Sequence, residues 1–265
     1  ESFTQRGDSV EYRDPMKRAF VVHRSSLVGS DQNQWHKQPV YLLGSDKYGR
    51  DILSRIFYGA RIALLVAVIS ETMSILIGIL LGALAGYFRG RVDDGIMWFT
   101  NVVWSFPTVL LVIAFSVILG NGVWQCFVAI GLTGWVDLTR VVRGQFLALR
   151  EAEFIEATRA FGFGTLRIIF RHLLTNTLGP ITVIATAGLA NAITFEASLS
   201  FLGLGVQPPT ASWGKMIQDG IAFLFVGQSL ELVLYPCIIL GMTVYAFNLF
   251  GDGLRDAIDP KTMQR

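Results

Sequence analysis

The chain has 265 residues, of which 52% are hydrophobic and only 16% are charged, and its formal net charge is +2. Soluble domains carry about 25% charged residues, so this composition indicates an integral membrane protein and gives no reason to expect nucleic acid as a partner. Cys126 and Cys237 lie in apolar runs without metal-ligand spacing. We therefore expect two packing residues, no metal site and no cofactor bound to this chain.

The first 57 residues are polar and mixed in charge, and their apolar cluster at residues 20–22 is far too short to cross a bilayer. We expect residues 1–57 to form an N-terminal segment ahead of a transmembrane domain over residues 58–265. Near its end, Ser45 or Asp46 is predicted to cap a short helix, because either side chain can accept a hydrogen bond from an unpaired backbone N–H.

Five membrane spans are predicted in an all-α, polytopic fold. The first runs over about residues 62–87. No charged residue occurs in the 42 residues from 95 to 136, enough for two spans of about 20 residues each, with a turn at residues 120–122. The fourth and fifth spans cover about residues 173–205 and 232–250. Pro107 should kink its helix, because proline removes one backbone hydrogen bond.

Three glycines, Gly78, Gly82 and Gly86, recur at every fourth residue and therefore share one face of the first predicted span. Such rows of small residues let two helices approach closely in lipid. We expect this face to pack against another helix of the same subunit, and contact with a second subunit is the alternative.

Acidic residues inside apolar spans are functional candidates by default, because an ionised carboxylate is costly in hydrocarbon. Glu71, Glu196 and Glu231 lie in or near the predicted spans. Glu196 stands in an otherwise uncharged span and is the best candidate for a residue that lines a transport pathway. The alternative is that it lies near the outer interface, where it is solvated or paired.

Between the third and fourth spans, residues 150–176 form a long charged interval that is predicted to hold two short helices broken at residues 162–164. Acidic residues at the front of Glu153–Phe161 suit a helix N-terminus. Apolar residues recur in it at helical spacing: Phe154, Ile155, Ala157, Thr158 and Phe161. Two interpretations remain, an amphipathic helix on the lipid surface and a docking helix for a soluble partner.

The distribution of basic residues predicts the orientation. The loops after the first and third spans, together with the C-terminal tail, carry eleven lysine and arginine residues, whereas the opposite short loops carry Lys215. The positive-inside rule makes the first side cytoplasmic. Five spans are an odd number, so the C-terminus is predicted to be cytoplasmic and residues 1–57 extracytoplasmic.

Several motifs resemble one transporter family. Glu156-Ala157-Thr158, followed by Gly162, resembles the Glu-Ala-Ala…Gly loop of ABC-importer permeases, although Thr175 stands where that family usually has proline. Residues 43–61, 201–214 and 251–260 resemble segments of the oligopeptide, dipeptide and nickel permeases, so the resemblance covers about residues 44–260. In that family a further transmembrane helix precedes the segment at 43–61, and we expect such a helix upstream.

The resemblance implies a type I ABC importer transmembrane domain in a bacterial or archaeal plasma membrane. It implies a cytoplasmic coupling loop over residues 143–176, whose docking residues for an ATPase are Phe154, Ile155, Glu156, Ala157, Phe161 and Gly162. The implied partners are a second permease, two ATPase subunits and an extracytoplasmic solute-binding protein. No phosphate-binding loop occurs in this sequence, so ATP and Mg²⁺ are expected on the ATPase chains, and this chain is expected not to be an enzyme.

The expected substrates are dipeptides or oligopeptides. Nickel, glutathione or sugar import by the same architecture is an alternative, as is an autonomous secondary transporter or channel. The second class needs an ion or proton site and usually an internal repeat, and neither is evident in the sequence.

Overall fold

The computed structural model describes residues 3–13, 19–23, 25, 41–224 and 230–258. The chain divides into two compact units, Glu1–Gly44 and Ser45–Arg265. The boundary therefore precedes the one that we predicted after residue 57. Residues 45–57 belong to the helical unit because Lys47 pairs with Asp219 and because the Trp213 indole donates a hydrogen bond to the carbonyl of Ile56 at 2.9 Å.

The first unit contains a three-stranded antiparallel sheet of order β1-β2-β3, formed by β1 (Phe3–Arg6), β2 (Ser9–Arg13) and β3 (Ala19–His23). Arg6 pairs with Ser9, so two residues connect β1 and β2. The first of them, Gly7, has φ +61°, which suits the type II′ turn that favours glycine at this position.

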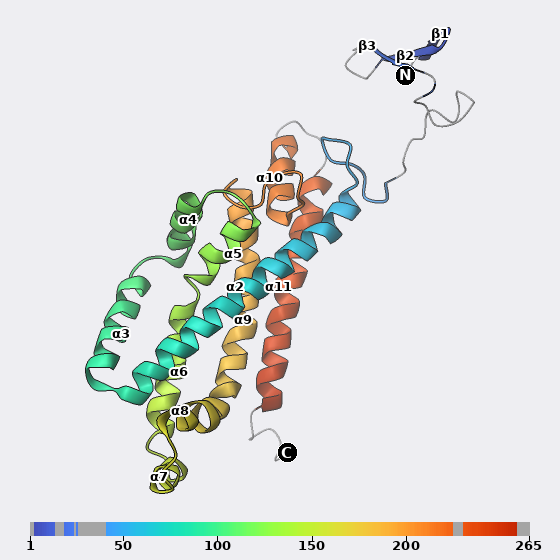
Figure 1. The fold of residues 1–265 in the computed structure, drawn as a ribbon. Helices are drawn as coiled ribbons and strands as arrows, with labels where there is room; N and C mark the ends of the chain where they lie inside the picture. The colour runs from blue at the N-terminus through green and yellow to red at the C-terminus, as the bar shows by residue number, and fades with distance from the viewer. Residues whose placement is uncertain (1–2, 14–18, 24, 26–40, 225–229, 259–265) are drawn as a thin grey trace. The chain divides into compact units, whose positions relative to one another are not determined.

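Three long helices dominate the second unit (Figure 1). They are α2 (Ile52–Phe88), α9 (Leu174–Phe201) and α11 (Glu231–Ile258). Helix α9 continues a preceding helical stretch, α8 (Thr165–Arg167) and the π-helical η2 (Ile168–Leu173). Within the described residues, three helices are long and apolar enough to cross a membrane: Ile52–Phe88, Thr165–Phe201 and Glu231–Ala257. Helix α10 (Trp213–Leu224) lies at one end of the unit.

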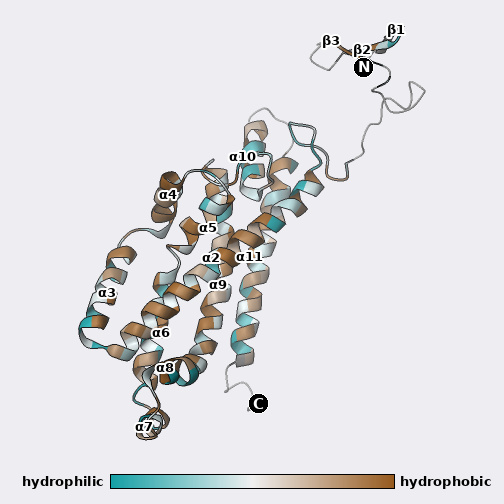
Figure 2. Ribbon diagram, viewed as in Figure 1, coloured by the Kyte–Doolittle hydropathy of each residue, from teal (hydrophilic) through white to brown (hydrophobic). Residues whose placement is uncertain are grey.

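The region of the second and third predicted spans is divided into four shorter helices. They are α3 (Gly90–Trp104), α4 (Thr108–Leu119), α5 (Val123–Gly131) and α6 (Trp135–Leu149). Pro107 stands at the start of α4, and α3 and α4 meet at 87°, a break rather than the kink that we predicted. Counted as one span, this bent pair raises the candidate spans to four, so the number five stays a prediction. Figure 2 shows α4 almost entirely hydrophobic.

Helix α2 begins at Asp51 rather than at the predicted cap. The Asp51 carboxylate accepts hydrogen bonds from the backbone N–H groups of Leu53 and Ser54. The predicted cap Asp46 instead accepts from the N–H groups of Tyr48 and Arg50, at 2.9 and 3.0 Å. Asp46 therefore closes the tight turn ahead of the helix, and the helix that follows is continuous with the first predicted span.

The three glycines of α2 all pack against α6. A Cβ at Gly78 would lie 2.9 Å from the Leu138 Cβ, one at Gly82 would lie 2.7 Å from the Thr139 carbonyl oxygen, and one at Gly86 would lie 2.5 Å from the Phe146 Cβ. Real Cβ atoms do not approach so closely. The row therefore serves close packing of two helices within this subunit, which is the interpretation that we expected.

A buried apolar cluster joins α2, α6, η2 and α9 near the charged interval. Its members are Ala83, Leu138, Val142, Phe146, Ile155, Ile168, Ile169, Leu173 and Ile181. Four members come from the charged interval itself: Ile155, Ile168, Ile169 and Leu173. The cluster therefore connects that interval directly to the long helices.

Candidate functional site

Helix α7 (Glu153–Ala160) lies at the same end of the helical unit as the C-terminal end of α11, away from the bodies of the long helices (Figure 1). Its bounds agree with the helix predicted over Glu153–Phe161. Gly162 follows with φ +76°. The N–H of Gly162 donates to the carbonyl of Arg159 at 2.9 Å, and the N–H of Phe163 donates to that of Thr158 at 3.1 Å. These two bonds define a Schellman motif, which requires the left-handed conformation that glycine adopts most easily.

The six predicted docking residues do not share one environment. Ile155 is fully buried in the apolar cluster, so it is not available to a partner, and its assignment as a docking residue is wrong. The remaining five, Phe154, Glu156, Ala157, Phe161 and Gly162, are exposed. Phe161 is 78% exposed and Phe154 is 42% exposed. Helix α7 is thus anchored from inside through Ile155 and presents two aromatic rings outward.

Two hydrogen-bonded arginines connect the residues just before α7 to the corner between α2 and α3. The Arg89 guanidinium donates to the Glu151 carboxylate at 2.7 Å and to the Leu147 carbonyl at 3.3 Å. In the other direction, Arg150 donates to the carbonyl of Tyr87. The hydrogen bond from Arg89 lowers the pKa of Glu151 below its ordinary value. Figure 2 shows hydrophilic residues gathered at the α2–α3 corner.

A second ion pair supports the same corner. The Arg143 guanidinium of α6 makes a bidentate pair with the Asp93 carboxylate of α3, at 2.5 and 2.6 Å. The sequence alone shows Arg89 and Arg143 only as positive charges, because their partners lie about 50 or more residues away along the chain. Helices α2, α3, α6 and α7 are therefore tied together at this end by specific pairs.

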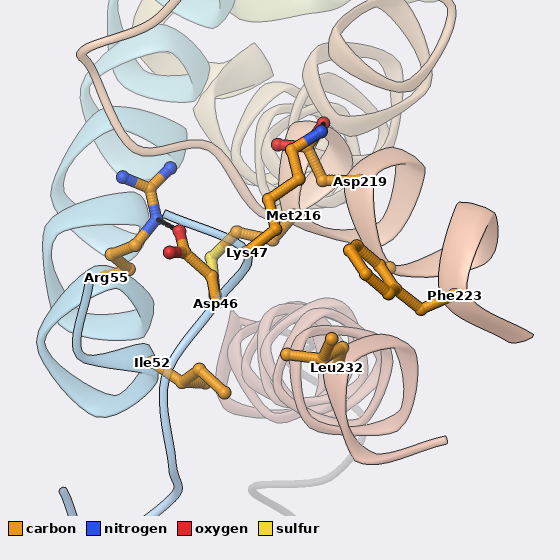
Figure 3. Close-up of a pocket in the computed structure, with 9 residues that line it drawn as sticks. Asp46, Lys47, Ile52, Arg55, Met216, Asp219, Phe223 and Leu232 are labelled. Atoms are coloured by element: carbon orange, nitrogen blue, oxygen red, sulfur yellow. Dashed lines mark hydrogen bonds and ion pairs between the residues drawn. The ribbon is translucent and has the colours of Figure 1, made fainter. Parts of the chain in front are cut away.

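At the opposite end, charged residues hold the segment before α2 against α10 (Figure 3). Lys47 Nζ lies 3.0 Å from the Asp219 carboxylate, and this hydrogen bond raises the pKa of Lys47. The Asp46 carboxylate lies 2.7 Å from the Arg50 guanidinium and 3.5 Å from that of Arg55. Of these charged residues, Asp46, Lys47, Arg55 and Asp219 line a small pocket, together with Ile52, Met216, Phe223 and Leu232. They fix the start of α2 and have the character of a structural clamp.

Glu196, the predicted pathway residue, is fully buried in α9. Its Oε1 accepts hydrogen bonds from the hydroxyls of Ser200 and Ser212, each at 2.8 Å. The Ser200 hydroxyl in turn accepts from the N–H of Val206 at 3.0 Å. Glu196 therefore fastens the segment after α9 back onto the helix, and in this conformation it neither lines the membrane cavity described next nor reaches solvent. Of the two interpretations, a paired carboxylate agrees with these hydrogen bonds, because Ser212, sixteen residues away, folds over Glu196.

A different acid, Glu71 of α2, lines a cavity of about 340 Å³ between α2, α3, α4, α5, α6 and α9. The polar residues of its wall are Glu71, Ser74, Thr108, Thr133, Asp137 and Asn191. Gly188 of α9 faces the Glu71 carboxylate so closely that a Cβ there would overlap it. Sequence reasoning named Glu71 as an intramembrane acid but preferred Glu196. The sequence alone does not show that Glu71 lines the same cavity as polar residues from other helices.

Comparison with known proteins identifies the family. Residues 78–264 match the model of the binding-protein-dependent transport system inner membrane component. The chain is 44% identical over 218 residues to the dipeptide transport system permease protein DppC of Bacillus subtilis (strain 168), covering 82% of this chain and 68% of the relative. It is 40% identical over 251 residues to the oligopeptide transport system permease protein OppC of the same organism, covering 93% and 79%.

A third relative is named for a different substrate, glutathione. The glutathione transport system permease protein GsiD of Pectobacterium atrosepticum is 41% identical over 219 residues, covering 83% of this chain and 72% of the relative. Among solved structures, an inward-facing MetNI methionine ABC transporter matches with a TM-score of 0.63, over 78% of this chain and 98% of that chain. Its 22% sequence identity supports a shared fold and no more. The chain belongs to the family of binding-protein-dependent transport system inner membrane components, as a multi-pass permease subunit of the ABC importer type.

Proposed function

We propose that this subunit forms, together with a second permease, the membrane pathway of an ATP-driven importer of dipeptides or oligopeptides. The observation that carries the substrate class is the 40–44% identity to dipeptide and oligopeptide permeases over more than four-fifths of the chain. Glutathione is itself a short peptide, so the glutathione relative falls in the same chemical class. Nickel and sugar import remain alternatives within the same architecture.

In this proposal α7 is the coupling helix, and its partner is an ATPase subunit. Two exposed aromatic rings, Phe154 in a short helix and Phe161 at its C-cap, follow acidic residues at the front of that helix. Aromatic side chains that fill a pocket on the partner carry much of the binding energy in interfaces of this kind, and a short helix placed in a groove is a recurrent binding mode. Exposure of Glu156, Ala157 and Gly162 beside them supports one continuous docking surface.

Movement of the coupling helix would then pass to the membrane helices through buried and charged contacts. Ile155 inserts into the cluster with Phe146, Ile168 and Leu173. The Arg89–Glu151 pair connects the same region to the end of α2. A displacement of α7 by closing ATPases would therefore move α2, α6 and α9 with it, which is the rigid-body route by which packed helices transmit a conformational change.

The proposed orientation places α7 and the C-terminal end of α11 in the cytoplasm, and residues 1–57 on the outer side. The support is the excess of lysine and arginine in the loops on the α7 side. An extracytoplasmic solute-binding protein would deliver the peptide on the α10 side. Two ATPases would hydrolyse ATP below the two permeases, with ATP and Mg²⁺ bound to those chains.

The test is reconstitution of this subunit with its second permease, ATPases and binding protein in proteoliposomes. ATP-dependent uptake of a dipeptide, an oligopeptide, glutathione, Ni²⁺ and a disaccharide is measured side by side. Uptake of peptides that requires ATP and the binding protein supports the proposal. Uptake of Ni²⁺ or sugar without peptide uptake would assign another substrate, and flux through this chain alone would indicate a channel or secondary transporter.

A further inference from the structure

The cavity beside Glu71 carries an inference about substrate recognition inside the membrane. Glu71 is nine-tenths buried, and among the residues that the structure describes none forms a hydrogen bond or ion pair with its carboxylate. A buried, ionised carboxylate is strongly destabilised unless it is paired. Its carboxylate faces the cavity, so the charge can be balanced there by a proton, by water or by a cationic partner that comes from outside the chain.

The wall of the cavity offers acceptors and no positive charge. Asp137 is a second carboxylate on it, and Ser74, Thr133 and Asn191 add neutral polar groups. None of the described residues that line the cavity is lysine, arginine or histidine. The basic residue one turn beyond Asp137, Arg140, is not a lining residue, but it lies against the wall: its guanidinium is 4.1 Å from the centre of the ring of Trp104, which lines the cavity, and it donates to the Asn101 side chain at 2.8 Å.

Gly188 indicates that the carboxylate is placed there by the packing of the helices. A side chain at this position would overlap the Glu71 carboxylate, so α9 presents bare backbone where α2 presents its acid. The Glu71 carboxylate of α2 therefore lies against α9 at Gly188, and Asn191 of α9 lines the same cavity. The volume of about 340 Å³ is at the lower end of the range for small-molecule sites.

We propose that this cavity binds a primary ammonium group of the transported solute, with Glu71 as its main counter-ion and Asp137 as a second carboxylate. This proposal rests on the proposed function, because a peptide brings such an ammonium at its amino terminus. The site would let a charged end of the substrate cross an apolar region without losing its partner. It assigns to the permease a recognition element of its own, separate from any selection made by the binding protein.

The test measures the charge selectivity of the cavity by the labelling rate of a cysteine placed in it. Ala187, which is exposed and lines the cavity beside Gly188, is replaced by cysteine in a Cys237→Ser background, and the buried Cys126 is kept. The assembled transporter, without nucleotide, is treated with cationic and anionic methanethiosulfonates of similar size. Labelling of this chain is quantified by mass spectrometry, with rates normalised to those of a small free thiol.

We expect the cationic reagent to react at least about tenfold faster than the anionic one, since an acidic cleft concentrates cations by factors of this order or more. Glu71→Gln should abolish most of this preference and Glu71→Asp should retain it. A dipeptide with a free amino terminus should slow the labelling, and its N-acetylated form should not. Equal rates for both reagents, a preference that survives Glu71→Gln, or equal protection by the two dipeptides would overturn the proposal.

Failure of the ammonium site can be distinguished from failure of the proposed function. If the reconstituted importer carries peptides but the cavity shows no charge selectivity, only the ammonium site fails. If the cavity selects cations in a Glu71-dependent way while proteoliposomes take up no peptide, the assignment of peptide as the substrate fails, and with it the ammonium of a peptide as the ligand.

Discussion

The backbone N–H of Phe163 donates to the carbonyl of Thr158 at 3.1 Å, across Gly162 in the left-handed conformation. This bond ends the proposed coupling helix and turns the chain toward α8. Because Gly162 has open space around its Cα, the requirement for glycine is conformational rather than steric. The junction is therefore a sensitive place to test the coupling model.

Gly162→Val should strain this junction, since a left-handed conformation costs a non-glycine residue about 1–2 kcal/mol and a β-branched one more. We expect ATP hydrolysis to continue while ATP-driven uptake falls, because α7 is no longer held in one orientation. Uptake and hydrolysis are measured in the same proteoliposomes. The matched control is Gly164→Val: Gly164 is also exposed and uncrowded but has φ −67°, so coupling should stay near wild type. Equal effects of the two substitutions would contradict the prediction.

Alanine substitutions of Ile155 and Phe161 should distinguish a loss of stability from a loss of ATPase docking. Ile155→Ala removes a fully buried side chain from the cluster below α7 and should cost about 2–5 kcal/mol, seen as a lower thermal midpoint of the purified subunit. Phe161→Ala removes a ring that is 78% exposed and should change stability by less than about 0.5 kcal/mol. Its effect should appear in ATPase binding, measured by co-purification. A Phe161→Ala subunit that retains its ATPase normally would contradict the docking role.

The contact between α2 and α6 should tolerate no side chain at Gly82. A Cβ there would lie 2.7 Å from the Thr139 carbonyl oxygen and from the Val142 Cβ, so Gly82→Ala should separate the two helices at a cost of about 1–3 kcal/mol. Gly144→Ala is the control on α6, because nothing lies within 4 Å of its added Cβ. That control should be neutral or stabilising by up to about 1 kcal/mol. The thermal unfolding midpoints of the two variants are measured in detergent. Equal midpoints for Gly82→Ala and Gly144→Ala would argue against the close packing.

The clamp before α2 should weaken in acid. Burial raises the pKa of Asp46, but hydrogen bonds from the N–H groups of Arg50 and Tyr48 and the Arg50 guanidinium outweigh it, so the net pKa is lowered. A carboxyl whose folded pKa lies below its unfolded value of about 3.9 stabilises fully above that value and loses the contribution as the pH falls through the folded pKa. Hydrogen exchange of residues 45–51, corrected for intrinsic rates, should therefore increase below about pH 4.

Asp46→Asn is the matched variant for that measurement. It should show faster exchange than wild type at pH 7, because the charge-assisted bonds to Arg50 are lost, and it should show little further change in acid. An acid-induced increase of the same size in Asp46→Asn and in wild type would assign the pH dependence to another group.

Much of the coupling segment was predictable because its signals are local. Helix α7 was expected over Glu153–Phe161 and ends at Ala160, and Gly162 gives the left-handed residue that ends it. The inward position of Ile155 was not predicted, although adjacent helical residues point about 100° apart. Phe154 and Phe161 face one side and Ile155 another, and the apolar pattern alone does not say which side is covered by the protein.

The acids show a different limit. Glu196 and Glu71 look alike in sequence, each a carboxylate within an apolar stretch. Their environments differ. Ser212 reaches the Glu196 carboxylate from beyond the end of α9, whereas Gly188 leaves room for the Glu71 carboxylate at the wall of the cavity. Contacts of this kind depend on how distant segments pack, so the sequence could nominate the acids but could not choose between them. The break between α3 and α4 at Pro107 likewise needed the structure to fix its angle of 87°.

The most direct test of the central claim is a density map of this subunit assembled with its second permease, ATPases and binding protein in lipid. The account predicts that α7 lies in a groove of an ATPase subunit, with the Phe154 and Phe161 rings within about 4 Å of its side chains and Ile155 still inside the cluster of α6, η2 and α9. A map in which α7 contacts only lipid headgroups or solvent, with no ATPase against it, would contradict the account.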